Sequence, residues 1–377
     1  MPWREVSSME CREEFVMLAR SDGSNVRELC QRFGVSPTTG YKWLSRYRAL
    51  GRVGLLEVSR RPHASPGRTA AALEDRIVQL RDQHPAWGGR KLRRRLQVLG
   101  EPVVPSASTI TQILRRHGRL DGGEAVKHRA FVRFEHAQPN DLWQMDFKGH
   151  FALGSGRCHP LSVLDDHSRF ALGLEACADE RGLTVQGRLR AIFRRYGLPW
   201  RLLVDNGAPW GDAADNPHTQ LTTWLLRLDV GVSHGRPYHP QTQGKAERFH
   251  RSLADEVLTG RPPADLVDCQ RRFDAWRHVY NTERPHQALG MTVPLARYSP
   301  SPRPFPEVLP PVEYDSTHDA VRRVDRNGHI SWRGRYYHIG RAFQGHPVAL
   351  RPTVQDGCFD VLFCRHPITT IDLTDKP

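Results

Sequence analysis

The 377-residue sequence predicts a multidomain protein with two all-α helix-turn-helix units, an α/β domain and a small C-terminal β-barrel. Three observations support this prediction. Within residues 1–120, short helical patterns twice lead through a turn into a further helix. Strand and helix patterns then alternate over residues 140–298, which is typical of a mixed sheet covered by helices. Short alternating runs follow, and the pair Asn327-Gly328 is a strong hairpin signal.

The composition indicates a polyanionic partner. Lys and Arg number 55 against 41 Asp and Glu, and the formal net charge is +14. Such an excess suits nucleic acid or an acidic membrane surface. No apolar run approaches the roughly 20 residues of a membrane span, and the start lacks the apolar core of a signal peptide. We therefore expect a soluble, intracellular protein. The seven cysteines form no Cys-x-x-Cys pair, which argues against a disulfide framework or a structural zinc.

The first unit, residues 1–51, is predicted to bind DNA. Apolar residues recur with helical spacing before Gly34, and Ser36-Pro37 caps and opens the third helix. Apolar side chains of this helix pack inward and polar ones point outward, which suits a recognition helix in a major groove. The outward residues are Thr38, Thr39, Lys42 and Arg46. The alternative is a plain three-helix bundle with a solvated basic face, but the net charge favours DNA binding.

Residues 52–68 are rich in Arg, Pro, Gly and Ser and are predicted to be a linker. A second DNA-binding unit, helix-turn-helix or winged-helix-like, is predicted over residues 69–120. Its outward basic residues are Arg90, Lys91, Arg93, Arg94, Arg115 and Arg116. We expect His117 to be a core-edge or helix-end residue rather than a metal ligand, because no second histidine stands at metal-ligand spacing. Residues 121–139 are predicted to be another linker.

Within residues 140–298, three carboxylates are candidates for a metal site. Asp146 lies in a strand whose apolar residues alternate with polar ones. Asp205 follows an apolar strand, at the carboxyl end where open α/β sheets bind ligands. Glu247 lies beside the buried stripe of a helix. Three converging carboxylates repel one another unless cations lie between them, and Mg²⁺ prefers such oxygen donors.

Several of these polar residues also have a local explanation. An isolated Asp after a strand, such as Asp205 taken alone, is most often a turn former or a helix cap. The pair Asp165-Asp166 is expected to make local hydrogen bonds in a hairpin turn rather than to bind metal. Arg284 and His286 lie where a proline terminates a helix, and a capped helix end is their expected role. The conjunction of three carboxylates nevertheless favours a metal site.

Five short motifs carry a resemblance to a known family. They are Trp143-Gln-Met-Asp146-Phe, Val163-Leu-Asp-Asp-His-Ser-Arg169-Phe, Val204-Asp-Asn-Gly207, His239-Pro-Gln-Thr-Gln-Gly-Lys-Ala-Glu247-Arg and Tyr280-Asn-Thr-Glu-Arg-Pro-His286. In this order they resemble the insertion-sequence transposases that carry a retroviral-integrase-like core with an Asp, Asp, Glu triad. The resemblance implies a ribonuclease H-like catalytic core with a C-terminal helical extension over residues 140–298. It assigns catalysis and metal binding to Asp146, Asp205 and Glu247.

The resemblance also implies an activity. Such a DNA transposase binds the terminal inverted repeats of its mobile element, cleaves at the 3′ ends and transfers the strands into target DNA. It is a two-metal-ion polynucleotidyl transferase that uses Mg²⁺, for which Mn²⁺ can substitute. We expect double-stranded DNA and at least a homodimer as partners, on the nucleoid in the cytoplasm of a bacterium-like cell. The alternative is a catalytically silent, transposon-derived, sequence-specific DNA-binding protein.

The chain departs from the family in two places. Asp205 and Glu247 lie 42 positions apart (247 − 205), which is more than usual, and we place the excess in the polar loop 209–218. Ala254 stands where many relatives carry a basic residue that contacts DNA. The predicted DNA contacts on this helix are Lys245, Arg248 and Arg251, with Arg251 or Arg248 replacing the missing basic residue.

The C-terminal part is predicted to form a second small domain. Residues 299–311 are rich in proline and are expected to be a semi-rigid linker. Residues 312–377 are expected to fold into a small β-barrel of about four to six strands. Its arginines either contact DNA or only keep the domain soluble; they are Arg322, Arg323, Arg326, Arg333 and Arg335.

Overall fold

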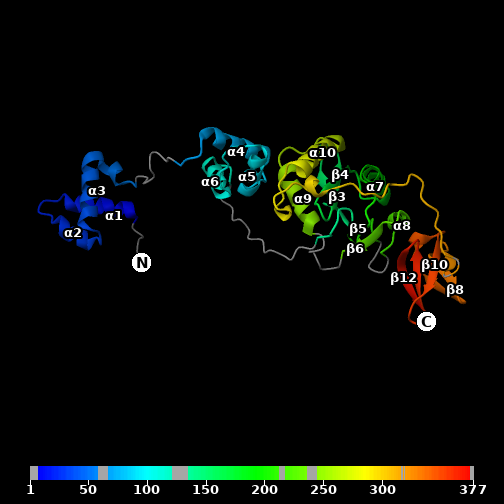
Figure 1. The fold of residues 1–377 in the computed structure, drawn as a ribbon. Helices are drawn as coiled ribbons and strands as arrows, with labels where there is room; N and C mark the ends of the chain where they lie inside the picture. The colour runs from blue at the N-terminus through cyan, green and yellow to red at the C-terminus, as the bar shows by residue number, and fades with distance from the viewer. Residues whose placement is uncertain are drawn as a thin grey trace. The chain divides into compact units, whose positions relative to one another are not determined.

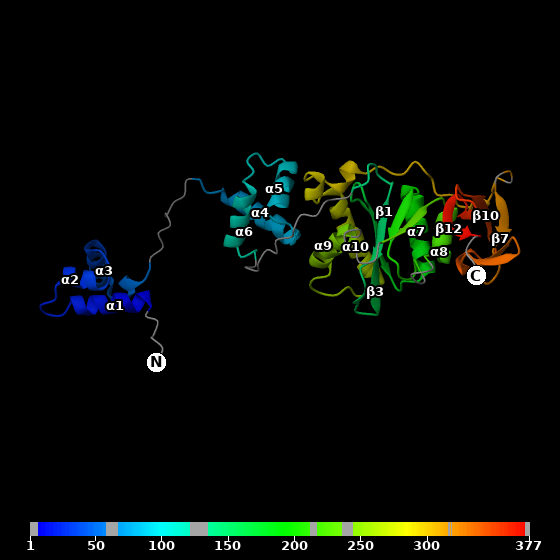
Figure 2. The same ribbon diagram turned by 90° about the horizontal axis from the view of Figure 1, so that it is seen from below.

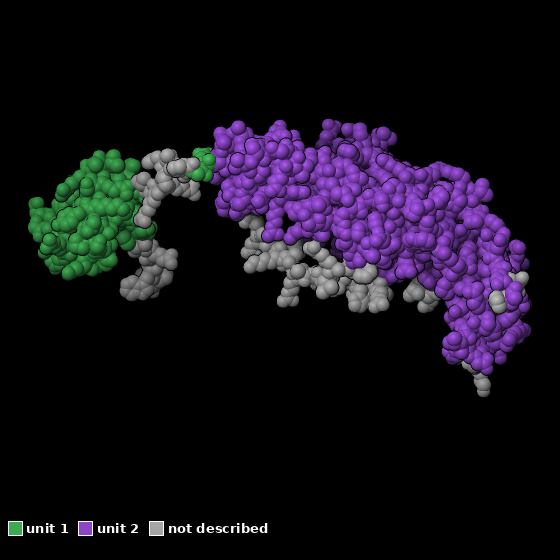
Figure 3. Space-filling model, viewed as in Figure 1, with its two compact units in different colours: residues 1–68 green, residues 69–377 purple. Residues whose placement is uncertain are grey.

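The computed structural model describes residues 7–57, 67–120, 135–211, 217–235, 244–315, 317 and 319–373. The chain divides into two compact units, residues 1–68 and residues 69–377 (Figure 3). Most of the two predicted linkers, at 58–66 and 121–134, lies outside the described residues, as does part of the predicted loop insertion, at 212–216. None of the described helices is both long and apolar enough to cross a membrane.

Unit 1 is a bundle of three α-helices and a 3-10 turn. These are α1 (Ser8–Ala19), α2 (Val26–Arg32), α3 (Pro37–Leu50) and η1 (Gly51–Leu55). Each α-helix starts where a side chain, from Ser7, Asn25 or Ser36, accepts backbone N–H groups of the first turn. The shared core consists of Phe15, Val16, Leu29, Cys30, Trp43, Leu44 and Leu55. A β-carbon at Gly40 of α3 would lie 2.4 Å from Cys30 Sγ, so this close helix packing requires glycine.

Unit 2 begins with a second three-helix bundle. Its helices are α4 (Ala71–Gln83), α5 (Gly89–Val98) and α6 (Ala107–Arg116). The buried core is Ile77, Leu80, Trp87, Leu92, Leu96, Ile110, Ile113 and Leu114. His117 follows α6 as its C-terminal cap, and its Nε2 lies 3.1 Å from Glu74 Oε2. His117 therefore ends the helix, as predicted, and holds it to α4.

A mixed sheet forms the centre of unit 2 (Figure 1). Its strands are β1 (Trp143–Phe147), β2 (Phe151–Ala152), β3 (Arg157–Asp165), β4 (Ala171–Cys177), β5 (Arg201–Val204) and β6 (Gly231–His234). The order is β2-β3-β1-β5-β6, and β4 also pairs with β3. β1 runs antiparallel to β3 and parallel to β5. This topology fits the predicted ribonuclease H-like integrase core.

Helices cover both faces of this sheet (Figure 2). The helices of the core are α7 (Gly182–Tyr196), α8 (Gln220–Arg227), α9 (Gly244–Val257) and α10 (Leu266–Thr282). α7 and α8 pack on the face that carries Trp143 and Met145. α9 and α10 pack on the other face, against Leu164 and Leu174 among others. Neither α8 nor β6 was expected from the sequence, although α8 has an apolar stripe that includes Leu221, Trp224 and Leu225.

The proline-rich segment 299–311 lies against the core and differs in this from the predicted linker. The Leu198 N–H donates to the Arg303 carbonyl at 2.8 Å, and the Ser301 N–H donates to the Tyr196 carbonyl at 2.8 Å. Phe305 packs against the apolar cluster of β1, α7 and α8. A high proline content removes backbone hydrogen-bond donors, and for this reason the segment resembles a linker in sequence. Its apolar side chains can still pack on the core, which explains why the structure differs from the prediction.

The C-terminal region forms two sheets. Its strands are β7 (Ala320–Arg323), β8 (His329–Trp332), β9 (Arg335–His338), β10 (Pro347–Pro352), β11 (Cys358–Phe363) and β12 (His366–Asp372). Four pair antiparallel in the order β12-β11-β10-β7, and β8 and β9 form a separate hairpin. Over residues 319–373 no pairing joins β12 to β7, so the predicted closed barrel is not confirmed. The strands β7 to β9 are four residues long each, and they share an apolar core instead of a closed ladder.

Candidate active site

Asp146 and Asp205 lie at matching positions of neighbouring parallel strands. Trp143 pairs with Leu202 and Gln144 pairs with Leu203. The same offset places Asp146 beside Asp205, which is the first residue after β5. Side chains alternate along a strand, and Trp143 and Leu202 face α7 and α8. Both carboxylates therefore belong to the opposite face, which α9 and α10 cover.

Helix α9 brings Glu247 to this same face. Its buried residues are Ala246, Phe249, His250 and Leu253. His250 Nε2 lies 2.7 Å from Ser162 Oγ, and Ser162 pairs with Asp146 in the β1–β3 ladder. Glu247 is exposed and lies three residues, about one helical turn, before His250. The strand pairing and the helix thus place the three predicted carboxylates around one part of the sheet.

The electrostatics of Asp146 show that these carboxylates influence one another. Burial, followed by the negative charges of Asp205, Glu247 and Glu180, raises the pKa of Asp146 to about 6. His250 Nδ1 lies 3.9 Å from Asp146 Oδ2, but burial lowers the pKa of His250 to about 4. At neutral pH the imidazole is therefore uncharged and does not offset the repulsion.

The loop after β5 is fixed by hydrogen bonds around Asp205. Its Oδ1 accepts the Asn206 N–H at 2.7 Å, and its carbonyl oxygen lies 3.0 Å from His234 Nδ1. The Asn206 side-chain amide donates to the Gly235 carbonyl at 2.9 Å and joins this loop to the end of β6. Asp205 is thus a turn former, as its local sequence suggests, and it is also exposed at the carboxyl end of β5.

The donor set suits a hard divalent cation. All three predicted ligands offer carboxylate oxygens, which Mg²⁺ prefers. The raised pKa of Asp146 reflects burial first and then the repulsion by neighbouring carboxylates, which a cation relieves. In the described part of the chain, no three His, Cys, Asp or Glu side chains lie close enough together to hold one ion. The fit therefore rests on the chemistry of the donors and on their shared face of the sheet.

The pair Asp165-Asp166 has a structural role. Asp165 accepts the backbone N–H groups of Asn140 at 2.8 Å and Ser168 at 2.7 Å. Asp166 accepts Gln144 Nε2 at 2.8 Å and the His136 N–H at 2.9 Å. The local bonding expected from the sequence occurs at Asp165 only, because Asp166 joins segments that are distant in the sequence.

Arg284 and His286 also stabilise the fold. Arg284 is 6% exposed and donates to Glu256 Oε1 at 2.7 Å and to Ser252 Oγ at 2.8 Å, which ties the end of α10 to α9. Burial lowers the pKa of His286 to about 3, so the ring is neutral. The role of Arg284 thus extends beyond the predicted capping of a helix end.

The predicted DNA contacts on α3 differ in their exposure. Thr38 and Lys42 are exposed. Thr39 Oγ1 lies 3.0 Å from Ser36 Oγ. The Arg46 guanidinium lies 5.0 Å from the centre of the Trp43 ring and donates to a backbone carbonyl of its own unit. The Lys42 ammonium group also lies 4.9 Å from the centre of the Trp43 ring. Thr38 is therefore the side chain of this set for which the described residues show no internal partner.

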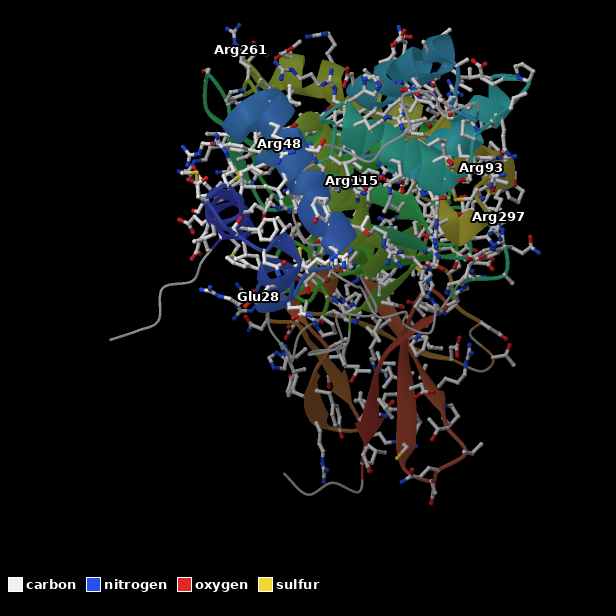
Figure 4. The ribbon with its side chains drawn as sticks, turned by 90° about the vertical axis from the view of Figure 1, so that its left-hand side faces the viewer. Glu28, Arg48, Arg93, Arg115, Arg261 and Arg297 are labelled. Carbon is white, nitrogen blue, oxygen red and sulfur yellow. The ribbon has the colours of Figure 1, made fainter. Side chains whose placement is uncertain are left out.

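The basic residues of α5 and α6 include both exposed and engaged side chains. The exposed ones that have no ion pair among the described residues are Arg90, Arg93, Arg94 and Arg115, and Figure 4 labels two of them. Arg116 is also exposed but pairs with the buried Glu74 at 2.6 Å. Lys91 is half-buried, and burial, with a smaller contribution from the charge of Arg284, lowers its pKa to about 8.

The three basic residues predicted on α9 also differ. Arg248 and Arg251 are exposed. Lys245 Nζ is paired with Asp166 Oδ1, and burial lowers the pKa of Lys245 to about 8. Its ammonium group is thus held by the buried Asp166 carboxylate.

Sequence reasoning missed His250, Ser162 and Glu180. His250 stands at i+3 from Glu247, so helical spacing alone could have placed it near the same site. Ser162 required the register of β3 on β1, and Glu180 required the path of the loop after β4. Local sequence predicts neither this strand register nor the path of this loop.

Family models match most of the chain. The helix-turn-helix domain matches residues 12–63 and the homeodomain-like domain residues 39–114. Two integrase core domain models match residues 136–240 and 228–294, and the C-terminal domain of IS481 family transposases matches residues 319–377. Together these matches give the chain the domains of an insertion-sequence transposase that carries an integrase core. As a transposase of this type it contains DNA-binding helix-turn-helix units, and the integrase core is a polynucleotidyl transferase domain that normally uses a divalent metal.

Relatives of the transposase occur in other insertion elements. The chain is 26% identical to an uncharacterized 31.7 kDa protein of insertion element IS407 from Burkholderia multivorans, over 67% of this chain and 89% of that protein. It is 27% identical to an uncharacterized 39.2 kDa protein of insertion element IS476 from Xanthomonas euvesicatoria, over 68% and 72%. Among solved structures, the simian T-cell lymphotropic virus intasome matches 76% of this chain and 91% of its own, with 15% identity and a TM-score of 0.39.

Proposed function

We propose that this transposase binds the terminal inverted repeats of its own mobile element and catalyses metal-dependent 3′-end cleavage and strand transfer into target DNA. Asp146, Asp205 and Glu247 are the proposed catalytic and metal-binding residues. One observation supports the proposal above all. The strand register sets Asp146 beside Asp205, α9 carries Glu247 over the same face, and burial, followed by the negative charges of both neighbours, raises the pKa of Asp146.

Two Mg²⁺ ions, with Mn²⁺ as a substitute, would activate the attacking oxygen and stabilise the leaving oxygen of the reacting phosphate. The chain supplies the positioning. Asp146 is held in the middle of the sheet, whereas Asp205 and Glu247 are exposed and leave access for a DNA strand. Phosphoryl transfer depends mainly on alignment and charge neutralisation, so a rigid set of carboxylates is sufficient on the protein side.

We also propose that different parts of the chain have different functions. Residues 1–51 and 69–120 recognise the element ends, 52–68 and 121–139 connect them, and 140–298 carry out the reaction. The proposed DNA contacts with exposed side chains are Thr38, Lys42, Arg90, Arg93, Arg94, Arg115, Arg248 and Arg251. Thr39, Arg46, Lys91 and Arg116 would have to leave internal partners or a partly buried position in order to contribute.

Oligomerisation is part of the proposal. Joining two element ends to one target requires two active sites, and two identical chains on inverted ends give a C2 arrangement, the commonest closed symmetry. We therefore propose at least a dimer on paired ends.

The test is a cleavage and joining assay on DNA from the flanks of the coding region, with Mg²⁺ or Mn²⁺. Asp146→Asn, Asp205→Asn and Glu247→Gln should each abolish both steps and leave end binding in gel shifts close to wild type. Asp255→Asn, which removes an exposed carboxylate from the same helix, is the matched control and should remain active. Retained joining in a triad variant removes that residue from the site.

The alternative is a catalytically silent, transposon-derived, sequence-specific DNA-binding protein. It predicts that the wild-type chain binds the element ends but cleaves nothing with either metal. The same assay therefore separates the two functions.

A further inference from the structure

An ion pair connects α9 to the turn between β3 and β4. Lys245 Nζ pairs with Asp166 Oδ1 and lies 3.3 Å from the Asp166 carbonyl oxygen. The Asp166 side chain is 0% exposed and the Lys245 side chain is 19% exposed. Separating two such charges leaves each one buried without compensation, which is strongly unfavourable. The pair therefore fixes the distance between the helix and the turn.

Asp166 provides a rigid anchor for this pair. Besides Lys245, its carboxylate accepts Gln144 Nε2 from β1 at 2.8 Å and the His136 N–H from the segment before β1 at 2.9 Å. The neighbouring Asp165 holds the turn through the N–H groups of Asn140 and Ser168. Because the Asp166 carboxylate is bonded to β1, to the segment before β1 and to α9, the position of Asp166 is determined from several directions.

Lys245 lies in the first turn of α9, two residues before Glu247. His250 attaches the next turn to the sheet through Ser162 Oγ, at 2.7 Å. Glu247 thus lies between two attachments of its helix. Among the residues that the structure describes, the Glu247 carboxylate makes no hydrogen bond or ion pair of its own. Its position over the sheet is therefore set by the helix that carries it.

We infer that the Asp166–Lys245 ion pair positions Glu247 over Asp146 and Asp205. Lys245 is then a positioning residue and not the DNA contact that the sequence predicted, because its ammonium group is already held by the core. This inference rests on the proposed function, in which the three carboxylates bind the metal. It also gives a reason for the burial of Asp166, a charged residue that lies outside the triad.

The test compares Lys245→Met, Asp166→Asn and the double variant in the full chain. Three quantities are measured: the melting temperature without metal, the MgCl₂ concentration at half of the metal-induced rise in melting temperature, and the affinity for end DNA. Each single variant leaves a buried charge unpaired and should melt lower, and the double variant should recover much of the loss. The MgCl₂ midpoint should rise about 10-fold in all three, as for other residues that orient metal ligands, with DNA affinity unchanged.

Arg284→Met is the matched control, because it breaks the other buried ion pair of α9, with Glu256. It should lower the melting temperature and leave the MgCl₂ midpoint at the wild-type value. A wild-type midpoint in the double variant overturns the positioning role. Weaker DNA binding by Lys245→Met but not by Asp166→Asn also overturns it and identifies a DNA contact.

The proposed function fails in a different way. A wild-type chain whose melting temperature does not respond to MgCl₂ or MnCl₂, and which cleaves no DNA, overturns the metal site itself. A wild-type chain that responds, with variants that respond equally well, overturns only the role of Asp166 and Lys245.

Discussion

Replacing Asp146 by Asn should stabilise the metal-free protein while it abolishes activity. The Asp146 side chain is 23% exposed, and its pKa is raised from the ordinary value of 3.8 to about 6 by burial and neighbouring carboxylates. At roughly 1.4 kcal/mol per pKa unit, the ionised form destabilises the fold by about 3 kcal/mol. Asn has nearly the same shape and no charge. Because its amide retains part of the desolvation cost, we expect a gain of about 1–2 kcal/mol.

The gain should depend on pH. Below the ordinary pKa of 3.8, Asp146 is protonated in both the unfolded and the folded chain, and variant and wild type differ little. As the pH rises toward about 6, the unfolded chain loses its proton while the folded chain keeps it, so the wild type loses stability relative to the variant. Above that pH the full difference remains.

Thermal unfolding in EDTA measures this effect. At pH 7 the transition of the core should lie roughly 2–8 °C higher in Asp146→Asn than in the wild type, and the two should converge near the acid end of the range. MgCl₂ should raise the melting temperature of the wild type but not that of Asp146→Asn. Asp255→Asn on α9 is the control, because it removes a carboxylate that is not one of the three proposed metal ligands. Equal melting temperatures of Asp146→Asn and wild type at pH 7 in EDTA would refute the reasoning.

Three further predictions concern DNA binding, stability and assembly. A fragment of residues 1–120 should bind end DNA in gel shifts, with an affinity that falls by about 10³ or more between roughly 50 and 200 mM salt; equal binding by a fragment starting at residue 137 contradicts this. Arg284→Met should cost about 3 kcal/mol in urea unfolding, since it leaves Glu256 buried without its cation. A binding-deficient chain with an intact triad, mixed with Glu247→Gln, should recover joining that neither chain shows alone if cleavage occurs in trans. A stable monomer on paired ends, seen by mass photometry, would contradict the proposed dimer.

Much of the core follows from local sequence. The strand with Asp146 shows the expected period of two residues, and it spans Trp143–Phe147. α7 ends at Gly197, whose φ of 78° is a conformation that favours glycine. α10 ends before Pro285, which cannot continue a helix. These features depend on a few adjacent residues, so no knowledge of the tertiary structure was needed to predict them.

Other features depend on contacts between distant segments and were therefore not predicted. Segment 299–311 resembles a linker in composition, yet Arg303 donates to the Pro199 carbonyl at 2.6 Å and Phe305 packs on the core. The strand signals after residue 311 are local, but the pairing that decides between one closed barrel and two sheets is not. The role of Lys245 likewise depends on Asp166, which lies 79 positions away.

The candidate site and the rest of the chain differ in charge, and this difference constrains the order of binding. The chain carries a formal charge of +14, and this excess attracts DNA from a distance. At the site, however, Asp146 lies among other carboxylates, His250 is neutral and Lys245 is held by Asp166. A phosphate that reaches this face meets like charges at short range, where screening by salt and water is weakest. We infer that cations must bind before, or together with, the DNA strand that is to be cleaved.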